Sequence, residues 1–273
     1  MWWSTSFRFL SRVLGPVVRF GGFVCSVAHL VARVQPVPMS FATAYGLTGD
    51  NERGEPTMPK LKLDMSMSLD GYIAAPGASL EDPLGKGGMR LHDWVFGLKS
   101  FREAHGMEGG DAESADNEIV TEITRGIGAV LMGRKMFSSG SGPWESDPNA
   151  DAWWGDDPPF HVPVFVLTHH EREPLVKQGG TTFHFVTGGL GSAVEQARAA
   201  AGDLDVSIAG GASIVQQCLA AGLVDGFQIH VVPVLLGGGV RLFDGTVPAP
   251  VELEAERVVA SPAVTHLRFS VNR

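Results

Sequence analysis

A pair of glycines, Gly210 and Gly211, separates an apolar segment from one with helical spacing. The residues before the pair are mainly small or β-branched, which is typical of a buried strand. After it, a helix is predicted to begin at Ala212 and Ser213 and to end before Gly222. The free N–H groups and the positive dipole end of such a helix suit a phosphate group. The pair indicates either a phosphate site or an ordinary strand-to-helix turn.

Polar residues also follow two other predicted strands. They are Gly133, Arg134 and Lys135 after one strand and Thr168, His169 and His170 at the end of another. Ligands of open parallel sheets bind beyond the carboxyl ends of the strands, so these segments and the glycine pair are expected at one edge. Together they favour a dinucleotide site. A standard Rossmann fold is disfavoured because no Gly-x-Gly-x-x-Gly motif occurs.

The elements that must position these strand ends alternate along most of the chain. Strands are predicted at 61–67, 127–132, 163–168, 183–187 and 205–209, and helices at 114–125, 192–201 and 212–221. Residues 75–113 form a long, polar, glycine-rich loop. The last four predicted strands have no helix between them and lie at 227–236, 240–243, 251–259 and 264–271. The pattern predicts one α/β domain, 58–273, with a mixed, mostly parallel sheet, flanking helices and an antiparallel C-terminal meander that ends in a hairpin.

The composition excludes several functional classes. The 273 residues carry a formal net charge of −9 without a basic stripe, which disfavours a nucleic-acid partner. Cys25 and Cys218 can form neither a disulfide framework nor a zinc site, and no convergent carboxylate or thiol spacing supports a metal site. A reducing cytoplasm is the simplest compartment. Within residues 1–35, the longest uncharged run, 20–32, is too short to span a bilayer.

Residues 1–57 differ from the remainder of the chain. They contain five arginines and three acids, whereas the remainder has 27 acids against 16 basic residues. Three interpretations are open: a targeting peptide, a membrane-surface helix interrupted by Gly15-Pro16 and Gly21-Gly22, or translation that begins at Met58. We favour the last interpretation because a clear strand follows Met58. Residues 1–57 are therefore expected to be disordered or to lie before the true start of translation.

Five motifs occur in a recognisable order. They are Ser68–Ala74, Gly128–Phe137, Pro163–Thr168, Ile208–Ala212 and Gly222–Phe243. Their order resembles the dihydrofolate-reductase-like superfamily. More closely, residues 60–273 resemble stand-alone relatives of the reductase domain of the bifunctional riboflavin-biosynthesis deaminase-reductase. The deaminase pattern, His-x-Glu followed by Pro-Cys-x-x-Cys, does not occur in the sequence.

The resemblance implies NADPH as the hydride donor. Gly133, Arg134 and Lys135 match the segment that meets the cofactor phosphates, where Arg134 offers a bidentate fork and Lys135 a point charge. Thr168 and His169 match the strand end near the adenosine 2′-phosphate, where the family often has an arginine after the hydroxyl residue. The alternative for His169 is an exposed loop position. The pyrophosphate turn is matched by Gly210, Gly211, Ala212, Ser213 and Ile214.

The resemblance also implies an acid beside the substrate. Asp116 or Glu118 at the start of the helix at 114–125 is one candidate, although a helix N-terminus favours acids in any case. Asp70, in the turn after the first strand, is the other, and its alternative is a carboxylate that binds its own backbone. Candidates for the substrate wall, or else for packing beneath loops, are His92, Trp94 and Trp144. His230 is interpreted as structural or as part of a subunit contact.

These observations favour an NADPH-dependent reductase that transfers a hydride to a small, flat nitrogen heterocycle, such as a pterin or a flavin precursor. The resemblance also implies a homodimer. The alternative is a non-catalytic dinucleotide-binding module that acts as a sensor or partner. A riboflavin-pathway reductase proper is less favoured, because the long loop offers only four cations for its phosphorylated substrate.

Overall fold

The computed structural model describes residues 58–245 and 250–272, except 80, 141 and 152. The expectations for residues 1–57 lie outside this part of the chain. Within the described part, no helix is both long and apolar enough to cross a bilayer.

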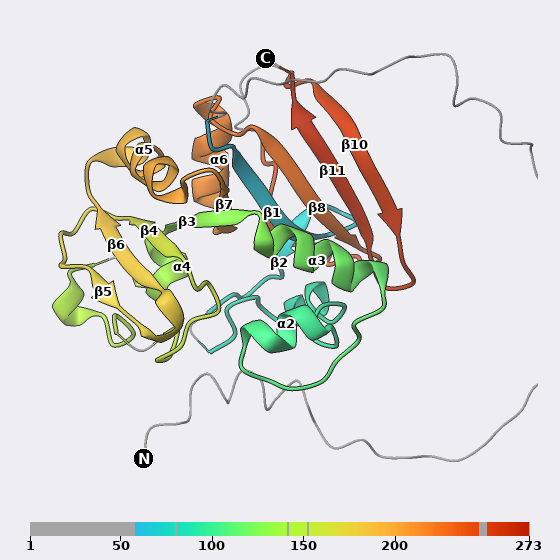
Figure 1. Cartoon of the computed structure of the whole chain (residues 1–273), viewed down its shortest axis with the longest axis horizontal. Helices are drawn as coiled ribbons and strands as arrows, with labels where there is room; N and C mark the ends of the chain where they lie inside the picture. Colours follow the sequence, from blue (N-terminus) through green and yellow to red (C-terminus); the bar gives the residue numbers. More distant parts are fainter. Residues whose placement is uncertain (1–57, 80, 141, 152, 246–249, 273) are drawn as a thin grey trace, which may run out of the picture. The chain divides into compact units, whose positions relative to one another are not determined.

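A mixed sheet forms the centre of the domain (Figure 1). In the described residues it has nine strands in the order β10-β11-β8-β1-β7-β3-β4-β6-β5. The strands are β1 (Leu61–Ser68), β3 (Ile127–Gly133), β4 (Pro163–Leu167), β5 (Leu175–Val176), β6 (Thr182–Val186), β7 (Asp205–Gly210), β8 (Gly226–Val232), β10 (Leu253–Ala260) and β11 (Thr265–Val271). The six strands from β8 to β6 are parallel, whereas β5, β10 and β11 pair in antiparallel fashion. The predicted fold class is therefore confirmed.

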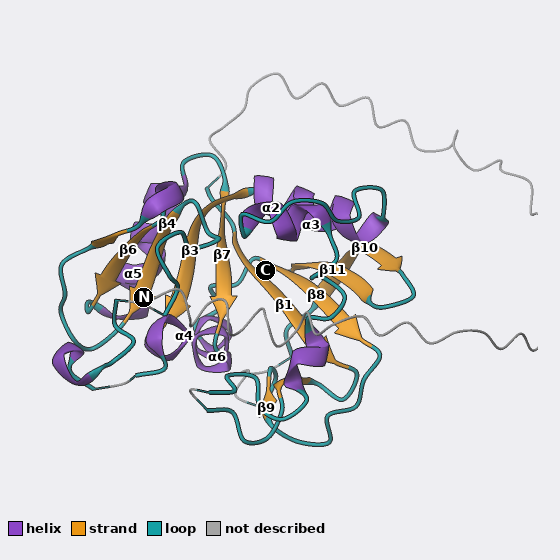
Figure 2. Ribbon diagram, turned by 90° about the horizontal axis from the view of Figure 1, so that it is seen from below, coloured by secondary structure: helices purple, strands orange, loops and turns teal. Residues whose placement is uncertain are grey.

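Helices cover both faces of the sheet (Figures 1 and 2). They are α2 (Lys99–Ala104), α3 (Ala115–Arg125), α4 (Arg134–Ser138), α5 (Gly189–Ala201) and α6 (Ala212–Ala220). Leu61 and Leu63 of β1 face the main hydrophobic core, which α5 and α6 complete with their buried apolar residues. Because side chains alternate along a strand, Asp64 and Ser66 point to the opposite face. That face meets α3 and the turns before α2, so polar residues of β1 lie beneath them.

The end of the chain differs from the predicted meander. The predicted strand at 227–236 ends at Val232 as β8, which runs parallel to β1. The segment predicted at 240–243 forms only β9 (Val240–Arg241), which leaves the main sheet and pairs with β2 (Tyr72–Ala74). Figure 2 shows β9 apart from the nine strands. Only β10 and β11 form the antiparallel C-terminal hairpin that was expected.

The predicted loop at 75–113 also contains regular structure. It includes a 3-10 turn, Gly88–Leu91, and helix α2, which packs against α3. Helix α2 has six residues, none of them buried. Because its side chains have no clear apolar face, helical periodicity could not reveal it.

Candidate functional site

The three predicted strand ends lie side by side in the sheet. Gly133 of β3 pairs with Leu167 of β4, and Met132 pairs with Gly210 of β7. Thr168 follows directly after Leu167, and its N–H donates to Val186 O of β6. The register therefore brings together the segments that the sequence assigned to a dinucleotide. Their contact with a cofactor remains a prediction.

The turn between β7 and α6 leaves its backbone open. Gly211 is the N-cap of α6 and has a φ of 80°, a conformation that favours glycine. A Cβ atom added there would meet no atom within 4 Å. Ala212 and Ser213 lie in the first turn of α6, where N–H groups have no acceptor within the helix. Ile214 is buried and anchors the turn to the core. This arrangement fits the phosphate site predicted for the glycine pair.

Arg134 has a different environment from the one its motif suggested. The side chain is 8% exposed, and its Nη2 lies 2.5 Å from Oδ2 of Asp147. Its Nη1 contacts Ser138 Oγ, and its guanidinium lies 3.6 Å from the ring centroid of Trp144. Burial opposes ionisation of Asp147, but hydrogen bonds from Ser138 and Arg134 hold its pKa below the ordinary value. Arg134 therefore has protein partners, whereas the neighbouring Lys135 is exposed.

Trp144 belongs to the same edge of the sheet. Its Nε1 donates to the carbonyl oxygen of His170 at 3.0 Å, so it joins the segment after β3 to the end of β4. Its ring also packs against Phe185 at 4.8 Å. These contacts agree with the packing alternative given above for Trp144. At the same strand end, Thr168 is buried and His169 is exposed.

Asp70 is held within its own turn. Its carboxylate accepts hydrogen bonds from Ser68 Oγ at 2.6 Å, from Leu236 N at 3.1 Å and from Gly237 N at 2.7 Å. The Ser68 hydroxyl is the main reason why the pKa of Asp70 is lowered. An ionised carboxylate with these partners is suited to accept hydrogen bonds rather than to give up a proton. The geometry agrees with the turn-carboxylate alternative.

Asp116 is in contact with side chains that the sequence analysis did not assign to the site. Its Oδ1 lies 2.9 Å from Nε2 of His266, and Nδ1 of His266 lies 2.6 Å from Nδ1 of His230. Nε2 of His230 lies 2.8 Å from Oδ1 of Asp64. His230 is 3% exposed in the described unit, so burial within the fold disfavours the subunit-contact alternative. His230 and His266 each occur in a predicted strand rich in apolar residues. This is the sequence signal that could have identified them as members of the site.

Trp94 and His92 lie beside these histidines. The Trp94 ring centroid is 4.8 Å from that of His230 and 5.1 Å from that of His266, and its Nε1 donates to Ser66 Oγ. Nδ1 of His92 is buried without a hydrogen-bond partner among the described residues. Burial, with the charge on His230, lowers the pKa of His92 to about 4. Trp94, His92 and Asp116 therefore form one group, separate from Trp144.

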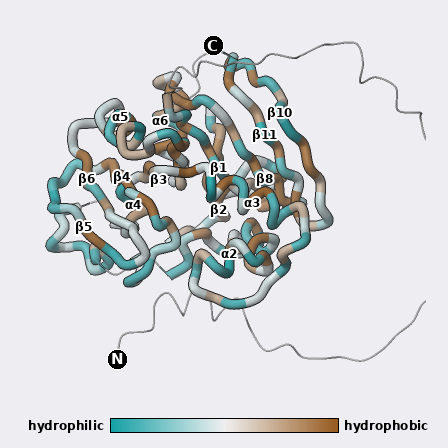
Figure 3. The backbone as a smooth tube through the Cα atoms, in the orientation of Figure 1, coloured by the Kyte–Doolittle hydropathy of each residue, from teal (hydrophilic) through white to brown (hydrophobic). Residues whose placement is uncertain are grey.

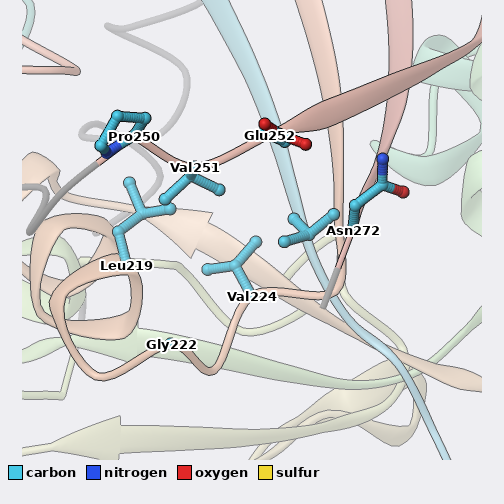
Figure 4. Close-up of a pocket in the computed structure, with 8 residues that line it drawn as sticks. Leu219, Gly222, Val224, Pro250, Val251, Glu252 and Asn272 are labelled. Carbon is cyan, nitrogen blue, oxygen red and sulfur yellow. The ribbon is translucent and has the colours of Figure 1, made fainter.

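A cavity of about 320 Å³ lies elsewhere (Figure 4). It is lined by residues from the C-terminal end of α6 and from the segments beside the start of β10 and the end of β11, namely Leu219, Gly222, Val224, Pro250, Val251, Glu252, Val271 and Asn272. Gly211 begins α6 and Gly222 follows its end, so this cavity is at the other end of the helix from the glycine turn. None of the residues predicted to bind a ligand lines it.

Comparison with known proteins identifies the family of this chain. Residues 59–267 match the RibD C-terminal domain family. The chain belongs to this family. Among solved structures, a putative riboflavin biosynthesis protein from Shewanella sp. PV-4 is 22% identical with a TM-score of 0.52. The match covers 78% of this chain and 99% of that chain, and it shows the shared fold.

Two other solved structures are more distant. A diaminohydroxyphosphoribosylaminopyrimidine deaminase/5-amino-6-(5-phosphoribosylamino)uracil reductase from Thermotoga maritima is 16% identical, with a TM-score of 0.47. The match covers 79% of this chain and 57% of that one. A pyrimidine reductase-like protein from Corynebacterium diphtheriae is 13% identical, with a TM-score of 0.45 and coverage of 79% and 92%. The curated proteins gave no match.

Proposed function

We propose that this member of the RibD C-terminal domain family is an NADPH-dependent reductase of a small, flat nitrogen heterocycle. The observation that carries the proposal is the alignment of three strand ends, at Gly133, Thr168 and Gly210, on one edge of a parallel sheet. Ligands of open α/β sheets bind at such edges. When bound, the nicotinamide supplies a hydride to a C=N or C=O bond of the substrate.

Particular residues are suited to hold the dinucleotide. The open backbone at Gly211 and the first-turn N–H groups of α6 suit the pyrophosphate. Lys135 is the exposed cation after β3, and His169 is exposed after β4, so both can approach a phosphate. Arg134 remains a predicted phosphate ligand, but it must act from within its ion pair with Asp147. Its stacking on Trp144 would then keep the guanidinium in a fixed position.

Titration of the full chain with NADPH and with NADH, followed by nicotinamide fluorescence, tests the cofactor. Tight and NADPH-selective binding is expected. Lys135→Ala should raise the NADPH dissociation constant about 10-fold, or roughly 1.4 kcal/mol, because a charge-assisted phosphate contact is lost. Glu145→Gln is a control in the 3-10 turn after α4, Trp144–Ser146, and should leave NADPH affinity unchanged. Absence of binding to either dinucleotide would contradict the proposal.

Turnover distinguishes a reductase from a sensor on the same fold. NADPH oxidation is measured with a panel of pterins, pyrimidines and quinones. A reductase oxidises NADPH only when an accepted heterocycle is present. Tight NADPH binding without turnover of any member of the panel would favour the sensor. The proposal also includes a cytoplasmic location and a homodimer.

A further inference from the structure

Four side chains, three of them buried and Asp64 partly exposed, form a continuous chain across three strands and one helix. Asp64 of β1 contacts His230 of β8 at 2.8 Å, and His230 contacts His266 of β11 at 2.6 Å. His266 contacts Asp116 of α3 at 2.9 Å. Neighbouring pairing in the sheet fixes this order, since His230 lies opposite both Ser66 of β1 and His266 of β11.

The three contacts fix how many protons the chain holds. Each contact joins two atoms that carry lone pairs, so each requires one proton between them. Two neutral imidazoles carry only two ring protons, one on each ring. With both carboxylates ionised, the histidine pair must therefore hold one additional proton. The four groups then carry a single net negative charge.

The pair has one arrangement in which His266 is the neutral ring. Burial lowers the pKa of His266, although its hydrogen bond with Asp116 acts in the opposite direction. His266 then donates from Nε2 to Asp116 and accepts at Nδ1 from His230. A protonated His230 donates at both nitrogens, and Asp64 supplies the adjacent negative charge.

The other polar side chains on this face of the sheet do not replace the contacts among Asp64, His230, His266 and Asp116. Arg268 of β11 pairs with Glu122 of α3 at 2.6 Å and donates to Gln228 of β8 at 2.9 Å. Trp94 packs over both histidine rings and donates to Ser66. His92 lies close enough to His230 for their charges to interact, and its own lowered pKa keeps it neutral near pH 7.

The two ends of the chain differ in access. The side chain of Asp116 is 12% exposed, and both its oxygens have partners, His266 on one and Ser261 on the other. The side chain of Asp64 is 28% exposed, and within the described residues only its Oδ1 has a hydrogen-bond partner. Asp64 is therefore the more accessible end of the chain.

We infer that Asp64, His230, His266 and Asp116 form a proton-storage site whose stored proton is delivered through Asp64 to the bound heterocycle. This inference rests on the proposed reductase function for its acceptor. Asp64 is then the catalytic acid, whereas His230, His266 and Asp116 are positioning residues. It replaces Asp70 as the candidate donor and gives Asp116 an indirect role.

The proton step is balanced by the proposed hydride transfer. Reduction of a C=N bond leaves an electron pair on the substrate nitrogen, and that pair takes the proton from the Asp64 carboxyl group. The N–H bond of the product forms as the O–H bond of Asp64 breaks. Asp64 has received this proton from Nε2 of His230. The histidine pair regains one proton from water through Asp64 before the next turnover.

Titration of the full chain with ¹⁵N-labelled histidine tests the storage site by NMR. Loss of signals in His230→Gln and His266→Gln assigns the two rings. The pair should release one shared proton in a single step as pH rises. Asp64→Asn should move that step about one pH unit lower, because the carboxylate no longer stabilises the cation. Glu122→Gln, a carboxylate of α3 outside the chain, should leave the step in place.

Two results would overturn the storage site. One is a pair that stays neutral at both rings over the whole pH range, and the other is a step that Asp64→Asn does not move. If Asp64→Asn does not fold, Asp64→Glu is titrated instead. It keeps the negative charge, so the single shared step must persist, and its replacement by two independent titrations rejects the site.

Turnover tests delivery separately. Asp64→Asn should lower kcat at least about 100-fold with little change in KM and in NADPH affinity, as expected for loss of a general acid. Asp64→Glu should restore part of kcat. An unchanged kcat in Asp64→Asn overturns delivery even where the NMR step is present. If the unsubstituted chain shows the NMR step but reduces no heterocycle, the proposed function and delivery are wrong, whereas the storage site stands.

Discussion

His92 is half-buried, and its Nδ1 atom is buried without a hydrogen-bond partner among the described residues. Its pKa falls from 6.5 to about 4 because burial, and then the charge on His230, disfavour its protonated form. The unfolded chain binds a proton at His92 below pH 6.5, but the folded chain does so only near pH 4. Stability contributed by this group is therefore complete above pH 6.5 and is lost as pH falls toward 4.

The free energy of unfolding should consequently decrease on acidification, with His92 contributing up to about 3 kcal/mol. Urea unfolding between pH 8 and pH 4 measures this slope. His92→Asn should have a shallower slope, and at pH 8 its difference from the unsubstituted chain reports packing alone. Equal slopes for the two proteins would show that His92 titrates normally in the folded state.

Arg134 and Asp147 form a buried ion pair, with side chains 8% and 2% exposed. Asp147→Asn leaves the guanidinium without its counter-charge, so the free energy of unfolding should fall by about 3 kcal/mol or more. Asp151→Asn is a matched control, because Asp151 also pairs with an arginine, Arg172, but is 73% exposed. Its loss should cost less than about 1 kcal/mol in urea unfolding. Similar losses in both variants would contradict the buried pair.

The phosphate site predicted at the N-terminus of helix α6 depends on the glycine there, Gly211. Gly211→Ala places a methyl group in the open space before the helix and should raise the NADPH dissociation constant about 10-fold or more, or roughly 1.4 kcal/mol. Gly222→Ala is the control at the other end of α6. Its φ of 65° is also left-handed and its Cβ also meets nothing, so it carries similar backbone strain.

Both variants should be slightly less stable, but only Gly211→Ala should lose NADPH affinity. The measurement is the fluorescence titration described above, at a temperature where both variants are folded. Equal dissociation constants for the two variants would remove the glycine turn from the cofactor site.

The outer strands of the sheet differ in what they offer to a second copy of the chain. Strand β10 has eight residues and exposes Leu253 and Val258, which are 42% and 62% exposed. Figure 3 shows both hydrophobic and hydrophilic segments along it. Strand β5, at the other edge, has only two residues. A long edge offers more unpaired backbone groups for strand addition, so we expect a homodimer to form through β10.

Sedimentation equilibrium of the full chain should give a dimer that Val258→Lys converts to a monomer. Val176→Lys is the matched control, because Val176 is 74% exposed on the opposite edge strand. A dimer that persists in Val258→Lys, or dissociates equally in both variants, would exclude the β10 edge.

Much of the whole molecule could be predicted from the sequence, because local patterns determine it. Alternation of apolar residues predicted β1, continuous apolar runs predicted β3 and β4, and small or β-branched residues predicted β7. Glycines at left-handed positions marked the turns around α6. Weakly patterned pieces were missed, such as α2, and β9 was joined to the wrong sheet. Its two residues carry too little pattern to specify a partner.

Only part of the candidate site could be predicted from the sequence. The strand-end segments were predictable because parallel strands align their carboxyl ends whatever their side chains are. The partners of Arg134, and the chain from Asp64 through His230 and His266 to Asp116, could not be predicted. These residues are far apart in the sequence, and only strand order and register determine which of them meet. The sequence alone therefore determined the elements and the edge that favours a dinucleotide, whereas tertiary packing decided which charged groups are buried together and share protons.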